Sequence, residues 1–252
     1  MRPNRSDSDS TRRSVPTRRA GPLHSLGARA AAGVALLSMF GLSGCTPGRV
    51  AVAGPMPAPA SRADVYLGQT RLEGPTRIDF EWQLNEQGSR VSGQGVARIE
   101  PPYRARLDLF HNMETAVTAA LVGDDLRLPP GAPDDVLPPV ELMWATLGVF
   151  RPFAGTELIG GDRLVDDGER LRYQSPGGRE LHFDLRGERV EAAEVVEDGS
   201  VVEWVRLETD PEGRYPLRAT YRNLVDYREL TITRTGVSDA EPFDPAIWTL
   251  GR

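Results

Sequence analysis

The sequence is poor in the residues that most catalytic and metal sites need. It has a single cysteine and no lysine, and beyond residue 44 its only histidines are His111 and His182. These two have no cysteine or further histidine at ligand spacing, so we expect no zinc or redox-metal site. The sequence also lacks a Gly-x-Ser-x-Gly elbow, a phosphate-binding glycine loop and a His-Glu-x-x-His motif. We therefore expect a protein that is not an enzyme and binds no cofactor.

The single cysteine, Cys45, ends an apolar stretch that follows an arginine-rich segment. From residue 30 to residue 45 the chain reads AAAGVALLSMFGLSGC, which has the length of a signal peptide's apolar region and is too short to span a bilayer. Its last four residues, LSGC, match a lipobox, so the segment resembles a bacterial lipoprotein signal. This resemblance implies cleavage before Cys45 and a diacylglyceryl group on its sulfur. The alternatives are an ordinary export signal with a chance cysteine, or a buried core segment.

The charge changes if this leader is removed. Residues 1–44 hold seven arginines and two aspartates, so their loss takes the formal net charge from −6 to −11. A domain this acidic is not expected to bind nucleic acid. Residues 46–62, TPGRVAVAGPMPAPASR, are rich in proline, alanine and glycine and show no periodicity. They predict an extended tether between a lipidated Cys45 and one domain over 63–252.

Within 63–252 apolar and polar residues alternate with a period of two, as in half-buried antiparallel strands. In residues 77–84, RIDFEWQL, the apolar positions Ile78, Phe80, Trp82 and Leu84 share one face. Similar runs occur at 103–109, 117–121, 171–173, 181–185, 217–221 and 230–232. Turn-forming residues separate them at intervals of roughly 8 to 12 residues. We expect a meander of about ten strands.

One stretch breaks this pattern. Residues 140–150, VELMWATLGVF, are almost entirely apolar and lie between Pro138-Pro139 and Arg151-Pro152, which predicts a short helix bounded by prolines. A helix this apolar must be buried from water, and the concave face of a curved sheet is the simplest surface to bury it. It forms either the lid of a cavity or a core plug.

The order of these segments resembles the LolA/LolB-like superfamily of lipoprotein carriers and receptors. A lipobox and a proline-rich segment precede a strand reading PYRARLDLF (102–110), a strand ending GDDLRL (123–128), the apolar helix, paired strands and a closing FDPAIW (243–248). The resemblance covers residues 63–250. It implies a mainly β fold, an unclosed and curved antiparallel barrel of about eleven strands with short lid helices, and an apolar cavity for acyl chains.

The resemblance also suggests which residues meet a ligand. In the membrane-anchored receptor of this superfamily, an exposed apolar residue in a loop between two early strands helps to insert lipoproteins into the membrane, and its counterpart by position is Met113. Met113 could equally fill a gap in its turn. The candidate lining residues come from two strands and the predicted helix, and each could instead be ordinary core: Phe80, Trp82, Leu107, Leu109, Met143, Trp144, Leu147 and Phe150.

The sequence thus predicts a monomeric, membrane-anchored lipoprotein that binds lipid or lipoprotein acyl chains and receives cargo from a soluble carrier protein. The alternative is a non-enzymatic envelope interaction module whose cavity is filled. Thr46 follows Cys45, where an aspartate would signal retention in the inner membrane. We therefore expect the periplasmic face of the outer membrane, with the outer leaflet of the cytoplasmic membrane as the alternative.

Overall fold

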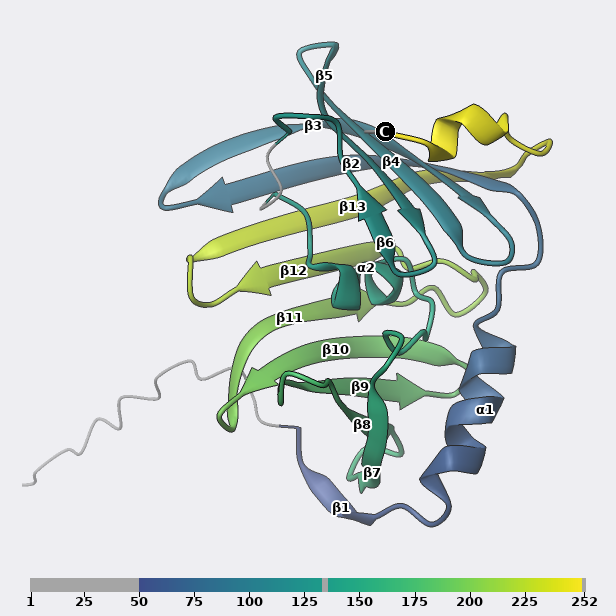
Figure 1. The fold of residues 1–252 in the computed structure, drawn as a ribbon, viewed down its shortest axis with the longest axis vertical. Helices are drawn as coiled ribbons and strands as arrows, with labels where there is room; N and C mark the ends of the chain where they lie inside the picture. The colour runs from purple at the N-terminus through teal and green to yellow at the C-terminus, as the bar shows by residue number, and fades with distance from the viewer. Residues whose placement is uncertain (1–49, 133–135, 251–252) are drawn as a thin grey trace, which may run out of the picture. The chain divides into compact units, whose positions relative to one another are not determined.

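The computed structural model describes residues 50–132 and 136–250, so the predicted leader and Cys45 lie outside the described residues. The described part contains two α-helices, one 3₁₀-helix and thirteen strands (Figure 1). In chain order these elements are β1 (Val52–Pro55), α1 (Pro59–Gln69), β2 (Thr76–Glu86), β3 (Ser89–Glu100), β4 (Arg104–His111), β5 (Glu114–Val122), β6 (Asp125–Arg127), α2 (Val140–Thr146), β7 (Glu157–Leu164), β8 (Glu169–Gln174), β9 (Glu180–Arg186), β10 (Arg189–Glu197), β11 (Ser200–Glu208), β12 (Arg218–Asn223), β13 (Arg228–Asp239) and η1 (Pro245–Trp248).

The strands form one antiparallel sheet in the order β1-β7-β8-β9-β10-β11-β12-β13-β2-β3-β4-β5-β6. It consists of two meanders, β2 to β6 and β7 to β13, joined where β13 pairs with β2. β1 and β6 are its free edges, so the sheet curves without closing (Figure 1). This confirms the mainly β, unclosed antiparallel fold, with thirteen strands where about eleven were expected.

The predicted tether differs from the structure from residue 52 onward. Val52 to Pro55 pair with β7, and the backbone N–H of Met56 donates to Gly161 O at 2.9 Å. Pro59 then begins α1, a position that suits proline because its missing N–H needs no partner there. Pro55 therefore belongs to an edge strand and Pro59 to a helix start, so the folded domain begins about ten residues earlier than predicted.

β3 went unrecognised in the sequence because two of its inner positions are glycines. Gly95 pairs with Phe80 and Gly93 with Trp82 on β2. A Cβ atom at Gly95 would lie 2.2 Å from the Phe80 ring, and one at Gly93 would lie 1.9 Å from Phe110 O. The large aromatic side chains of β2 therefore use space that side chains on β3 would otherwise fill, and the apolar alternation of β3 is lost.

α2 is shorter than the predicted helix, because it ends at Thr146 and Gly148 turns the chain with a φ of +78°. It lies inside the curve of the sheet (Figure 1) and packs on β10, β11 and β12. The indole Nε1–H of Trp144 donates to Gly123 O at 2.7 Å, in the turn between β5 and β6. α2 therefore links the two meanders across the concave face.

The C-terminal segment is fixed to the opposite, outer face of the sheet. Arg106 donates to Ile247 O and Arg127 donates to Trp248 O, which holds η1 on β4 and β5. Beneath it, Asp108 accepts hydrogen bonds from Arg106 and Thr118. Burial alone would raise the pKa of Asp108, but these bonds and the charges of Arg106 and Arg98 lower it overall.

Candidate functional site

The concave face of the sheet, here called the inner face, is lined by apolar side chains from both meanders. The alternation predicted for β2, β4 and β9 places Phe80, Leu107 and Phe183 there, all buried. Their polar neighbours in sequence, such as Arg106 and Asp108, point to the outer face. This period-two arrangement gives a domain with a continuous apolar interior under α1 and α2.

α1 closes the interior beside β8 and β9. Its Tyr66 contacts Phe150 at a ring-centroid distance of 6.1 Å, and Phe150 lies edge-on to Phe183 at 5.1 Å. The Tyr66 hydroxyl donates to Glu169 at 2.7 Å. Burial, followed by the hydrogen bond to Glu169, raises the pKa of Tyr66 to about 12. Part of the covering layer is therefore an aromatic cluster fixed to the first residue of β8.

An apolar pocket of about 30 Å³ remains inside the domain. Typical small-molecule sites have volumes of about 300 to 1,000 Å³. The pocket is far too small for an acyl chain, so the interior is closed in this conformation. Its lining comes from β2, β3, β4, β12, β13, the end of α2 and the loop before β12: Ile78, Phe80, Ala97, Leu107, Thr146, Leu147, Tyr215, Pro216, Ala219, Ile232 and Arg234.

The structure brings together three of the eight candidate lining residues, Phe80, Leu107 and Leu147, around this pocket. The other five, Trp82, Leu109, Met143, Trp144 and Phe150, are buried in the same core but do not line the pocket. Several lining residues were not singled out from the sequence. Ile78, Ala219 and Ile232 were visible in the alternation, whereas nothing in the local sequence marks Tyr215, Pro216 or Arg234.

Met113 occupies the tip of the β4–β5 hairpin and is 98% exposed. Asn112 and Met113 both have positive φ, at 50° and 66°, as in a two-residue hairpin turn of type I′. His111 supports the tip through a 2.8 Å hydrogen bond between its Nδ1 and Ser92 O. Met113 therefore does not fill a gap in the turn, and its side chain is available for contact with another surface.

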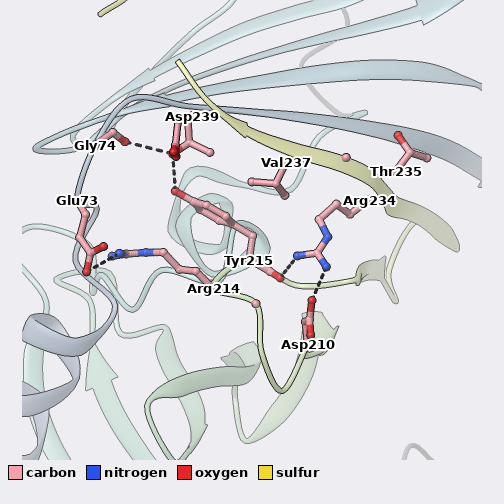
Figure 2. A pocket seen from close by; sticks show the side chains of 12 residues that line it. Glu73, Gly74, Asp210, Arg214, Tyr215, Arg234, Thr235, Val237 and Asp239 are labelled. Atoms are coloured by element: carbon pink, nitrogen blue, oxygen red, sulfur yellow. Dashed lines mark hydrogen bonds and ion pairs between the residues drawn. The ribbon is translucent and has the colours of Figure 1, made fainter. Parts of the chain in front are cut away.

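A polar cleft of about 520 Å³ opens next to the apolar pocket, where the loop 209–217 approaches β13 and the start of β2 (Figure 2). Arg234 donates to Asp210 at 2.6 Å and to Tyr215 O at 2.7 Å, which fastens this loop to β13. The hydrogen bond from Arg234 keeps the pKa of Asp210 below its ordinary value, so this ion pair persists in mild acid. Tyr215 and Arg234 line both cavities and separate them.

Ionisable groups also gather on the inner face at the opposite end of the strands. Arg228 donates to Glu86 at 3.1 Å, and Asn223 donates to Oε1 of Glu203 at 3.2 Å. Oε2 of Glu203 accepts no hydrogen bond from the described residues. Burial raises the pKa of Glu203, and the positive charge of Arg179 only partly opposes this.

Within residues 50–132 and 136–250, no group of three or more His, Cys, Asp or Glu side chains is arranged to hold a metal ion. The helices of the same ranges include none that is long and apolar enough to cross a membrane.

Comparisons with known proteins bear on the fold. No family model and no curated protein matches the sequence. Among solved structures, a LolA superfamily protein from Nitrosomonas europaea has a TM-score of 0.50 and 12% identity, covering 74% of this chain and 97% of that chain. A domain assigned to outer membrane lipoprotein sorting, from Vibrio parahaemolyticus, has a TM-score of 0.52 and 9% identity, covering 74% and 95%. A DUF1329 family protein from Desulfovibrio piger has a TM-score of 0.50 and 8% identity, covering 75% and 96%.

These similarities extend over nearly the whole length of each solved chain, so they concern a complete domain and not a shared motif. Together with the open antiparallel sheet and its two covering helices, they show that the described part of the chain has a LolA-like fold. At identities of 8 to 12% this similarity establishes the fold alone.

The pKa of Glu203 gives a test of the inner-face ion cluster. Because its pKa is raised in the folded protein, the ionised carboxylate destabilises the fold at neutral pH, and this cost disappears below the unfolded-state value of about 4.3. Glu203→Gln should therefore raise the free energy of unfolding at pH 7 and leave it nearly unchanged at about pH 3.5. Urea unfolding at both pH values measures this. Glu208→Gln, on the same strand with a side chain 63% exposed, is the control and should change little. Lower stability of Glu203→Gln at pH 7 would show that the cluster stabilises the carboxylate.

Proposed function

We propose that this domain binds an acyl chain of a lipid or lipoprotein between the sheet and its covering layer, and acts without catalysis in envelope lipid or lipoprotein transport or insertion. The observation that carries the proposal is the apolar pocket on the inner face, roofed by the end of α2 and by the loop 209–217. Burial of an acyl chain contributes about 25 cal/mol of binding free energy per Å² of apolar surface removed from water. Such a ligand therefore needs few polar contacts to stay bound. The LolA-like fold of the solved relatives supports the same interpretation.

The closed interior favours a second candidate. With about 30 Å³ free, the described conformation is also that of an interaction module whose cavity is filled. The two functions differ in whether the covering layer can move away from the sheet. Chain binding requires this movement, whereas an interaction module uses an edge or a loop and keeps its interior closed.

Filling the pocket separates the two functions. The double substitution Ala97→Val and Ala219→Val places methyl groups where a chain would enter the pocket. Excluding about two methylenes of the ligand, at about 0.8 kcal/mol each, predicts an affinity about tenfold lower for a fluorescent fatty acid. Ala192→Val, on the outer face, is the control because Ala192 is buried to a similar degree away from the pocket. Absence of binding by the wild-type protein would favour the interaction module, and equal binding by all variants would place the ligand elsewhere.

We further propose that Cys45 is lipidated and anchors the domain to the periplasmic face of the outer membrane, with the outer leaflet of the cytoplasmic membrane as the alternative. Residues 46–51 separate Cys45 from β1. A chain of this length reaches at most about 25 Å. An anchored domain, which we take to be monomeric, would work next to the membrane and exchange cargo with a soluble carrier protein there.

Mass spectrometry of the membrane fraction tests the anchor. We expect a mature protein that begins at Cys45 and carries the mass of a diacylglyceryl group and an N-linked acyl chain. Cys45→Ser should abolish this mass and release the protein from the membrane pellet. A mature chain that still begins at Met1, or that carries a free thiol at Cys45, would contradict the proposal.

The exposed Met113 supports a second membrane contact. Placing one methionine side chain in the apolar part of a bilayer gains about 2 kcal/mol, so Met113→Asp should weaken vesicle binding by more than tenfold. The measurement is vesicle flotation of the full chain carrying Cys45→Ser with and without Met113→Asp, so that the difference between the two chains reports on Met113 alone. Val165→Asp is the control, because Val165 is 66% exposed in the turn after β7, at the other end of the strands. Equal flotation of the two variants would exclude a role for Met113.

A further inference from the structure

The polar cleft beside the apolar pocket has the form of a head-group site. Its walls come from three separate parts of the chain: the segment before β2, the loop 209–217 and the end of β13. Gly74, Gly213 and Gly236 line the cleft without placing a side chain in it. Its volume of about 520 Å³ falls in the range of small-molecule sites. Figure 2 shows Arg214 and Asp239 on different walls, with the Tyr215 ring between them.

A single layer of side chains divides this cleft from the interior. Tyr215 is only 6% exposed, and both it and Arg234 line the cleft and the apolar pocket. Its hydroxyl is held by one long hydrogen bond of 3.3 Å to Thr76 Oγ1. Arg234 binds the backbone of Tyr215 and not its ring, so movement of the ring would not break this hydrogen bond. Rotation of this ring would join the cleft to the pocket.

The charges of the cleft are mixed. Arg214 pairs with Glu73 at 2.9 Å, but the Glu73 side chain is 87% exposed, and so exposed a pair contributes little to stability. Its guanidinium can therefore exchange Glu73 for a phosphate, which it binds in bidentate geometry. Asp239, on another wall, is exposed and forms no ion pair with any residue of the described ranges. A lining of two arginines and three carboxylates suits a ligand that carries both signs of charge.

We propose that the cleft binds the zwitterionic head group of a phospholipid, with its phosphate at Arg214 and its amine at Asp239, while one acyl chain passes Tyr215 into the apolar pocket. The inference rests on the proposed function, because it needs an interior that accepts a chain. It narrows the ligand from any acylated molecule to a phospholipid. A lipoprotein anchor, which has no phosphate, would make no use of Arg214.

Titration calorimetry of the full chain with lauroyl-lysophosphatidylethanolamine and with monolaurin tests the assignment, since both ligands carry the same chain. We expect the lysophospholipid to bind at least tenfold more tightly. Arg214→Gln and Asp239→Asn should each lower the affinity for the lysophospholipid about tenfold. Neither substitution should change the affinity for monolaurin. Arg186→Gln is the control, because its exposed pair with Asp166 lies outside the cleft.

Three outcomes would overturn the assignment, and they are distinguishable. Equal affinity of the wild-type protein for the two ligands would show that the cleft does not recognise the head group. Variants that weaken the binding of both ligands equally would show the same. Either result would leave the proposal of chain binding intact. Glycerophosphoethanolamine binding as tightly as the lysophospholipid would show that the cleft takes a free head group without a chain. Absence of binding by either lauroyl ligand would contradict the proposed function as well.

Discussion

The pairing of β13 with β2 is the contact on which the rest of the domain depends. It runs from Arg228 opposite Glu86 to Asp239 opposite Thr76 and joins the two meanders into one sheet. Because of this pairing, Phe80 and Ile232 face the same apolar pocket, although they lie far apart in the sequence. The cleft depends on it too, since its walls include Thr76 and Asp239, which pair at one end of the two strands.

The interior of this domain is apolar and closed. The covering layer is held partly by packing, as in the aromatic cluster of Tyr66, Phe150 and Phe183, and partly by hydrogen bonds. Near the loop 209–217 the hydrogen bonds dominate, and several are solvent-exposed or long. Opening at this place would expose the buried ring of Tyr215, whereas lifting α1 would expose Tyr66 and lifting α2 would expose Trp144.

Local sequence patterns predicted the fold class and the strands whose residues alternate, such as β2, β4 and β9, because side-chain direction in a strand has a fixed period of two. They failed for β3, whose inner glycines depend on aromatic side chains of β2, and for β1 and α1, whose prolines read as a tether. Phe80, Leu107 and Leu147 could be proposed as lining residues from the pattern together with the family resemblance. Tyr215 and Arg234 could not, because their positions follow from long-range pairing of β13 and from the path of an irregular loop.

Acyl-chain binding by this protein requires that the space between the sheet and its covering layer accepts the chain. Native mass spectrometry of the full protein, extracted from membranes in a mild detergent, tests it most directly. We expect a population heavier than the lipidated chain by the mass of one further lipid, which is lost when the protein is denatured. A single native species with the mass of the lipidated chain alone, even after incubation with excess phospholipid, would contradict it.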